Sequence, residues 1–146
     1  DDTDRGLWVA IQPALQHGAF IGSAGEGRIS SAARADYAEA AAVALTAPAQ
    51  AGKVYELAGD DSYTLAEFAA ELSRQSGKQI PYVNLPEADY KAALLGAGLP
   101  EPIADLLSAS DVGAAQGGLF DDGHQLSRLI GRPTTPLATL VAAALQ

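Results

Sequence analysis

RADYAEAAAVALTAP (residues 34–48) and GKVYELAGD (residues 52–60) are the two adjoining segments that decide the fold. In the first, Asp36 and Glu39 have the spacing of a capping box. We therefore expect Asp36 to be the N-cap of an alanine-rich helix. In the second, valine, tyrosine and leucine lie between two glycines, which predicts a strand over residues 53–58. A helix followed by a strand indicates an α/β protein.

Hydrophobic periodicity predicts the remaining elements. Thr64 and Glu67 form a second capping-box pattern, and Gly77 is placed to end the helix that follows. Thr135 before Pro136 predicts the N-cap of the last helix. We expect further helices near residues 7–17, 64–76, 86–96, 100–107, 121–130 and 135–145, and short strands near residues 28–30 and 80–85. This pattern predicts one helix-rich α/β domain over residues 1–146.

Composition restricts the classes of function. Hydrophobic residues make up 48% of the 146 residues, enough for a globular core. The net charge of −9 argues against nucleic acid or an anionic membrane surface as a partner, since both attract basic patches. We find no signal peptide and no apolar run long enough to cross a bilayer. The absence of cysteine excludes thiolate metal sites and is consistent with a cytoplasmic protein.

The chain contains no methionine and begins at Asp1. We therefore expect a fragment, a processed chain or one that starts internally.

Residues with catalytic chemistry are few, and most have a simpler explanation. His17 is placed to stabilise a helix end, and His124 is expected on the solvated surface. The two histidines lack the spacing of a zinc site, so we expect no metal. The serines lack a nucleophile-elbow pattern, and neither Tyr37 nor Tyr55 has a lysine four residues later to lower the pKa of a phenol. The sequence therefore predicts no catalytic acid or base.

The glycine-rich stretch GSAGEG (residues 22–27) resembles a phosphate loop in glycine content alone. Its spacing is wrong, Glu26 would repel a phosphate, and no helix is predicted directly after it. We expect a turn here.

Arg34 is the strongest candidate for a binding residue. It stands next to a predicted helix start, where a guanidinium can bind a phosphate or a carboxylate through two hydrogen bonds. The alternative is a structural ion pair with Asp36 or Glu39.

A set of short segments, met in this order along the chain, carries a resemblance to a known family. They are HGAFIG (17–22), RADYA (34–38), GKVYELAGD (52–60), QSGKQ (75–79), SDVGA (110–114), GGLFDD (117–122) and LIGRPTT (129–135). From Pro13 to Leu145 the chain resembles the C-terminal half of the NmrA-like NAD(P)H:quinone oxidoreductases, atypical short-chain dehydrogenases related to triphenylmethane reductase.

The resemblance implies a fold and an activity. The chain would be the C-terminal part of a Rossmann-like protein, with a helix-rich substrate lobe and a few short, mainly parallel strands. The glycine-rich fingerprint of the dinucleotide-binding half is absent from the chain. The intact protein would reduce quinones or similar electron-poor molecules with NADPH or NADH, without a metal. A homodimer is a further expectation.

The resemblance also assigns residues. Arg34 would lie on the cofactor side of the cleft. For such an activity, Trp8, Phe20 and Phe120 are our own candidates for apolar walls of the substrate site. For each of these three aromatics, packing in the core is the alternative. Two other functions stay open at this point: an NmrA-like regulator that senses NAD(P) without turnover, and a stand-alone α/β domain with a ligand of its own.

Overall fold

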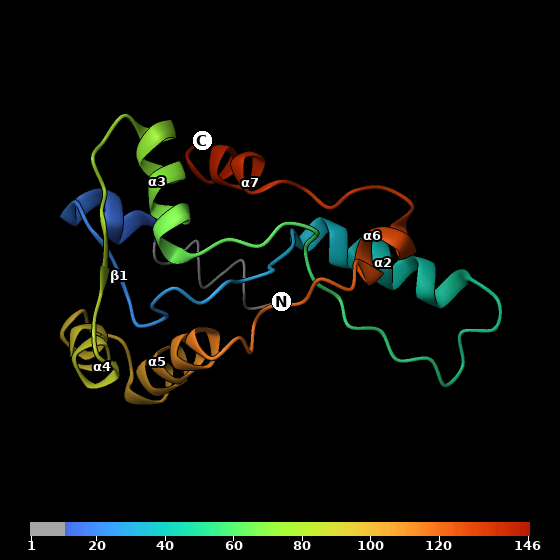
Figure 1. The fold of residues 1–146 in the computed structure, drawn as a ribbon, viewed down its shortest axis with the longest axis horizontal. Helices are drawn as coiled ribbons and strands as arrows, with labels where there is room; N and C mark the ends of the chain where they lie inside the picture. Colours follow the sequence, from blue (N-terminus) through green and yellow to red (C-terminus); the bar gives the residue numbers. More distant parts are fainter. Residues whose placement is uncertain (1–10) are drawn as a thin grey trace.

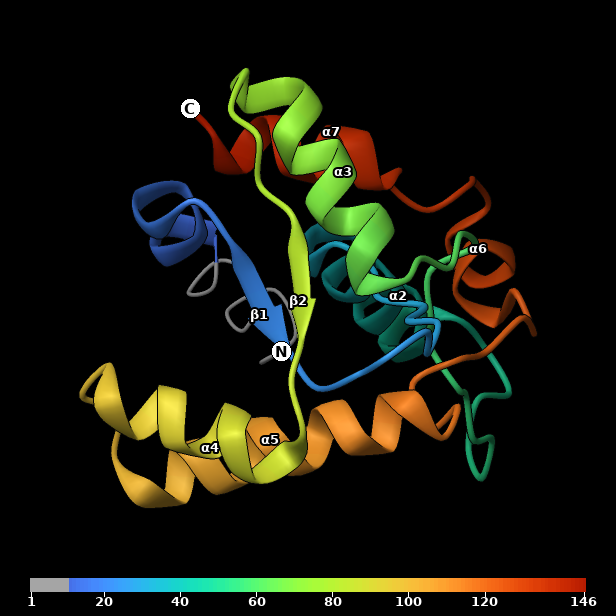
Figure 2. The ribbon, with the colours of Figure 1, turned by 60° about the vertical axis from the view of Figure 1, so that its left-hand side comes forward.

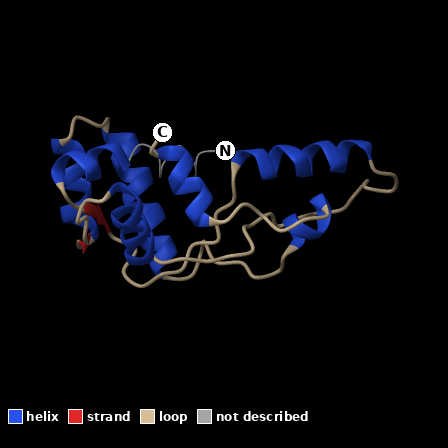
Figure 3. Cartoon of the chain, turned by 90° about the horizontal axis from the view of Figure 1, so that it is seen from above, coloured by secondary structure: helices blue, strands red, loops and turns tan. Residues whose placement is uncertain are grey.

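A computed structural model describes residues 11–146, in which helices surround one small sheet (Figure 3). Residues 11–17 are helical. The elements that follow are β1 (Phe20–Gly22), α2 (Arg34–Thr46), α3 (Leu65–Ser76), β2 (Tyr82–Asn84), α4 (Glu87–Gly96), α5 (Glu101–Ala115), α6 (Gln125–Ile130) and α7 (Leu137–Ala144). This arrangement confirms the helix-rich α/β class.

The two strands are parallel and side by side (Figure 2). Their register pairs Phe20 with Tyr82 and Ile21 with Val83. Phe20 is buried, whereas Ile21 and Val83 are exposed, so one face of the sheet is packed and the other is open. The strand predicted near residues 80–85 is confirmed in shorter form.

The main core lies between the packed face of the sheet and α3. The ring of Phe20 lies 5.2 Å from that of Phe68 and 6.2 Å from that of Tyr82, measured between centroids. Leu72 is fully buried beside them. Burying one such side chain is worth about 1.5–3 kcal/mol, so this cluster accounts for much of the stability of the fold.

Helix α3 begins and ends as predicted. The amide of Glu67 donates to Thr64 Oγ1 (3.1 Å), and the amide of Thr64 donates to Glu67 Oε2 (3.1 Å). At the other end Gly77 has a φ of 69°, the left-handed conformation that suits glycine. Both ends of α3 are therefore fixed by local sequence.

The molecule has two lobes joined by extended segments (Figure 1). The large lobe contains the sheet with α3, α4, α5 and α7. We call α2, α6 and residues 47–58 the small lobe. Its core is slight: among the described residues, its buried members are Ala32, Ala40 and Leu126.

The prediction for the start of α2 was wrong. The helix begins at Arg34 after Ala33, and no side chain caps it. Asp36 lies inside the first turn and is completely buried. It is buried because it binds residues 132–135, almost a hundred positions further along the chain, a contact that short-range spacing cannot reveal.

Residues 53–58 do not form the predicted strand. They are extended, and Val54 is 88% exposed. The amide of Glu56 donates to Gln125 Oε1 (3.2 Å). Apart from that bond, no backbone group of residues 54–58 is hydrogen-bonded to another described residue. A strand needs a partner, and residues 11–146 do not supply one.

Three further boundaries differ from expectation. Residues 28–30 contribute only an isolated antiparallel bridge, between Ile29 and Tyr63. The helix predicted from residue 121 begins at Gln125, because His124 has a φ of 53°. The last helix is capped by Pro136 and not by Thr135, whose hydroxyl and amide both donate to Asp36.

Candidate functional site

A cavity of about 340 Å³ lies beside the segments that join the two lobes. It is lined by residues 29–31, by Tyr37 of α2, by residues 56–58 and by residues 118–121. Small-molecule sites usually have volumes of about 300–1,000 Å³. The cavity is therefore large enough for one aromatic ring system.

Ser30 lines the cavity and is hydrogen-bonded to other segments beside it. Its amide donates to the carbonyl of Leu119 (2.9 Å), and its carbonyl accepts from the amide of Gly59 (2.8 Å). Its hydroxyl accepts from the amide of Asp121 (3.1 Å). The buried Ser30 thus fixes the positions of the segments that contain Gly59 and residues 119–121.

The walls expose apolar surface to the cavity. Leu119 and Phe120 are 41% and 45% exposed, although large apolar side chains are usually buried. Tyr37 lines the cavity from α2 and also packs on the core of the small lobe. Such a surface suits a flat, apolar ligand, because aromatic rings prefer to stack in offset geometry.

Two carboxylates complete the lining. Glu56 is exposed, and Asp121 is half-buried with its Oδ1 accepting from the amide of Gly123 (2.9 Å). Among the described residues that line the cavity, none is basic. The polar character of the cavity is therefore acidic.

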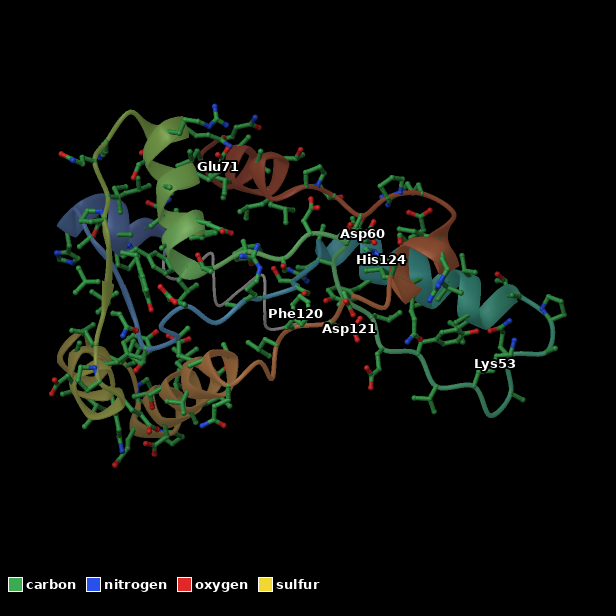
Figure 4. The ribbon with its side chains drawn as sticks, in the orientation of Figure 1. Lys53, Asp60, Glu71, Phe120, Asp121 and His124 are labelled. Carbon is green, nitrogen blue, oxygen red and sulfur yellow. The ribbon has the colours of Figure 1, made fainter. Side chains whose placement is uncertain are left out.

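The residues predicted for the site fall in different places. Phe120 lines the cavity (Figure 4). Arg34 is exposed and lies three residues before Tyr37 on α2, but it is not among the residues that line the cavity. Phe20 is 4% exposed in the main core, where its alternative explanation placed it. Trp8 lies outside the described residues.

Asp60 and His124 form a pair that the sequence did not indicate (Figure 4). The Oδ1 atom of Asp60 lies 2.8 Å from His124 Nδ1 and accepts from Ser127 Oγ (2.7 Å), while its Oδ2 accepts from the amide of Thr134 (3.0 Å). Burial raises the pKa of Asp60, but these hydrogen bonds together lower it by more, so the pKa of Asp60 is below its ordinary value. His124 is on the surface, as predicted, but is held in place.

Asp36 has a similar environment. Its carboxylate accepts from the amide of Thr135 (2.7 Å) and from Arg132 Nη2 (2.8 Å). Burial raises the pKa of Asp36, and the hydrogen bonds from Thr135 and Arg132 outweigh burial, so the pKa is lowered. Arg132 also pairs with Glu39. Asp36 and Glu39 therefore bind Arg132, and the predicted capping box does not exist.

The glycine-rich loop is not a phosphate site. The amide of Ser23 donates to Asp111 Oδ2 (2.8 Å), that of Ala24 to the Tyr82 hydroxyl (3.2 Å) and that of Gly25 to Asn84 Oδ1 (2.9 Å). These side chains take the donors that a phosphate would need, and no helix follows the loop. The predicted turn is confirmed.

Asp111 differs from Asp36 and Asp60 because its pKa is raised. Burial raises its pKa, and the hydrogen bond from the amide of Ser23 offsets this only in part. It does not line the cavity. We interpret Asp111 as the link that holds α5 against the loop after β1.

The sequence did not indicate Glu56, Asp121, Leu119 or Tyr37 as a group. They meet because Ser30 bonds to Asp121, 91 residues further along the chain, and no spacing in the sequence records that contact. The GGLFDD segment, residues 117–122, was the one available signal.

Two other classes of site receive no support. Among residues 11–146, no three histidine, cysteine, aspartate or glutamate side chains are grouped to hold a metal ion. No described helix is long and apolar enough to cross a membrane.

The sequence is similar to that of characterised reductases. It is 60% identical to quinone oxidoreductase 2 of Escherichia coli (strain K12) over 136 residues, which are 92% of this chain and 48% of the relative. It is 30% identical to the NAD(P)H azoreductase of Xenophilus azovorans over 95% of this chain and 49% of that enzyme. No family model matches the chain.

The fold is similar to solved structures of the same kind. The E. coli NADPH-dependent quinone oxidoreductase QOR2, solved in complex with NADPH, matches 98% of this chain and 50% of its own chain with a TM-score of 0.95 and 55% identity. Citrobacter sp. triphenylmethane reductase complexed with NADP(H) matches 97% of this chain and 50% of its own chain, with a TM-score of 0.91 and 31% identity.

The chain spans about half the length of the curated relatives that it matches. The matches cover nearly all of this chain, and they agree in sequence and in fold. The chain is therefore similar to one half of these quinone oxidoreductases and triphenylmethane reductases, and it fits the C-terminal portion of an NmrA-like reductase.

Proposed function

We propose that the complete protein reduces quinones, or similar electron-poor small molecules, with NADPH, and that the 340 Å³ cavity is the acceptor site. The observation that carries this proposal is the exposed apolar wall formed by Leu119 and Phe120 in a cavity of ligand size. The identity to E. coli quinone oxidoreductase 2 supports the assignment.

The same comparison favours an enzyme over a regulator that senses NAD(P), because the relatives at 60% and 30% identity are both named as reductases. A homodimer and a cytoplasmic location stay predictions from the sequence.

The cofactor would be held only partly by this chain. NADPH supplies a hydride, which together with one proton from solvent converts a quinone to a hydroquinone and leaves NADP⁺. Among the described residues, Arg34 has the chemistry to bind a phosphate, and the glycine-rich loop does not, since its amides already have partners. NADH is the alternative reductant that the sequence left open.

A nucleotide-binding half would supply the remaining contacts, and the small lobe has a surface that fits it. Leu45 and Val54 are 87% and 88% exposed, on α2 and on the extended segment after it. Within residues 11–146, the backbone of residues 54–58 has no hydrogen-bond partner apart from Gln125, which accepts from the amide of Glu56. We therefore place the nucleotide-binding half against this face, where residues 53–58 would join its sheet as the strand that the sequence predicted.

The residues of this chain would act by position and not by proton transfer. Phe120, Leu119 and Tyr37 would stack on the acceptor and exclude water, and Ser30 keeps the two walls at a fixed separation. A quinone accepts hydride without an obligatory acid, because its reduced oxygen is stable in water until solvent protonates it. This agrees with the absence of a predicted catalytic residue.

The proposal is tested by NADPH oxidation. The full-length protein is mixed with NADPH and a neutral benzoquinone, and the loss of NADPH absorbance is followed. We expect turnover, and we expect Phe120→Ala to lower kcat/KM about tenfold, since an apolar contact of this size is worth roughly 1–3 kcal/mol. Leu106→Ala is the matched control, because Leu106 is exposed on α5 and does not line the cavity. NADPH binding without oxidation would overturn the enzyme assignment.

A further inference from the structure

We infer that the cavity selects among acceptors by charge and prefers cationic acceptors to anionic ones, through Glu56 and Asp121. The inference rests on the proposed function, because it takes the cavity to be the acceptor site. It goes further in naming the charge class of the acceptor and the two residues that set it.

The two carboxylates come from different segments of the lining. Glu56 belongs to the extended segment of the small lobe, and Asp121 to the segment between α5 and α6. Leu57 and Phe120, their neighbours in the chain, line the same cavity. An aromatic acceptor stacked on Phe120 would therefore occupy a cavity that both carboxylates line.

Neither negative charge is paired with a cation in the part of the chain that the structure describes. Asp and Glu side chains are ionised at neutral pH, and within residues 11–146 neither Glu56 nor Asp121 is in an ion pair. The basic side chains that follow Asp121 are already engaged: Arg128 donates to the carbonyl of Gly123, and Arg132 binds Asp36 and Glu39.

The position of Asp121 is also fixed. Its amide donates to Ser30 Oγ (3.1 Å), and its Oδ1 accepts from the amide of Gly123 (2.9 Å). A charge held in place loses less to reorganisation than a mobile one, so it discriminates more strongly between ligands of opposite sign. Glu56 is exposed, so it contributes a weaker and more screened interaction.

The rest of the molecule adds to this field. The chain carries a net charge of −9, which attracts cations and repels anions at long range. Two unit charges about 4 Å apart change affinity about fivefold even at the dielectric constant of bulk water, with opposite sign for a cation and for an anion. We therefore expect kcat/KM for a cationic acceptor to exceed that for an anionic one by at least about tenfold at low salt.

The test compares three benzoquinones of similar size in the full-length protein with NADPH: one neutral, one with a quaternary ammonium group and one with a sulfonate group. We expect the ratio of kcat/KM, cationic to anionic, to fall several-fold in Asp121→Asn and in Glu56→Gln, and to fall in wild type as salt is added. Asparagine at position 121 keeps the oxygen that accepts from Gly123. Glu26→Gln removes an exposed charge that does not line the cavity, and should leave the ratio unchanged.

The outcomes separate the two proposals. Reduction of the neutral quinone with a ratio near one, a preference for the anion, or a ratio insensitive to both substitutions would overturn the charge selection and leave the proposed function standing. If none of the three quinones is reduced, the proposed function fails, and the charge selection fails with it.

Discussion

Asp36 joins two parts of the chain that are far apart in sequence. It is completely buried, and a buried carboxylate is stable only when hydrogen bonds replace its water. Thr135 and Arg132 supply those bonds. Asp60 ties the loop after residue 59 to α6 and to Thr134 in the same way. The connection between the lobes therefore depends on ionised aspartates.

This dependence predicts a loss of stability in acid. An unfolded aspartate has a pKa of about 3.9, and the folded pKa values of Asp36 and Asp60 are lower. Their contribution to stability is therefore present above the unfolded pKa and is lost as the pH falls through the folded pKa. We expect the free energy of unfolding, measured by urea titration, to decrease from about pH 5 downward.

The variant Asp36→Asn is the control for this prediction. It should be less stable at pH 7 and should show a shallower loss in acid, because the proton linked to Asp36 is gone. The effect of Asp111 on stability has the opposite pH dependence. Because its pKa is raised in the folded state, its contribution to stability is present at low pH and is lost as the pH rises through the folded pKa. If the free energy of unfolding of Asp36→Asn fell as steeply below pH 5 as that of wild type, the assignment to Asp36 would be contradicted.

At the scale of elements, the sequence predicted the helix ends that depend on neighbouring residues, and it failed where an element depends on a residue far along the chain. Helix α3 was predicted at both ends because Thr64, Glu67 and Gly77 act within one turn of the helix termini. The strand over residues 53–58 and the start of α2 were wrong, since each depends on a partner elsewhere: a neighbouring strand in one case and Thr135 in the other. In the cavity, Phe120 was predicted and Asp121 was not, although they are neighbours.

The capping box of α3 gives a prediction for that helix. Thr64→Ala removes the side-chain acceptor for the amide of Glu67, and we expect it to lower the free energy of unfolding by about 1 kcal/mol. Urea unfolding followed by circular dichroism measures this. Thr46→Ala is the matched control, because the Thr46 hydroxyl donates to the carbonyl of Ala42 inside α2 and caps no helix start; its effect should stay within about 0.5 kcal/mol. Equal losses in the two variants would show that the cap is not the cause.

At the scale of the whole molecule, the chain provides one side of a site. The large lobe has a substantial core, whereas the small lobe rests on a few buried side chains and on its hydrogen bonds to residues 132–135. The cavity lies between these two parts. Under the proposed function this chain would supply the acceptor wall, while the described residues contain few groups that could hold a dinucleotide.

This division predicts that the 146-residue chain alone does not bind NADPH. Isothermal titration calorimetry of the isolated chain should give no measurable heat of binding, because the amides of the glycine-rich loop already donate to Asp111, Tyr82 and Asn84. The full-length protein under the same conditions is the positive control. Micromolar binding by the isolated chain would instead support a stand-alone domain with its own nucleotide site.

The extended segment of residues 54–58 has a consequence for handling the chain in solution. It contains valine, tyrosine and leucine, and within residues 11–146 its backbone has no hydrogen-bond partner apart from Gln125, so it presents an edge with which a strand of a neighbouring molecule can pair. Lys53 and Glu56 are the charges that oppose such recruitment, as gatekeepers do beside aggregation-prone segments. One of these two charged side chains, Glu56, also lines the cavity.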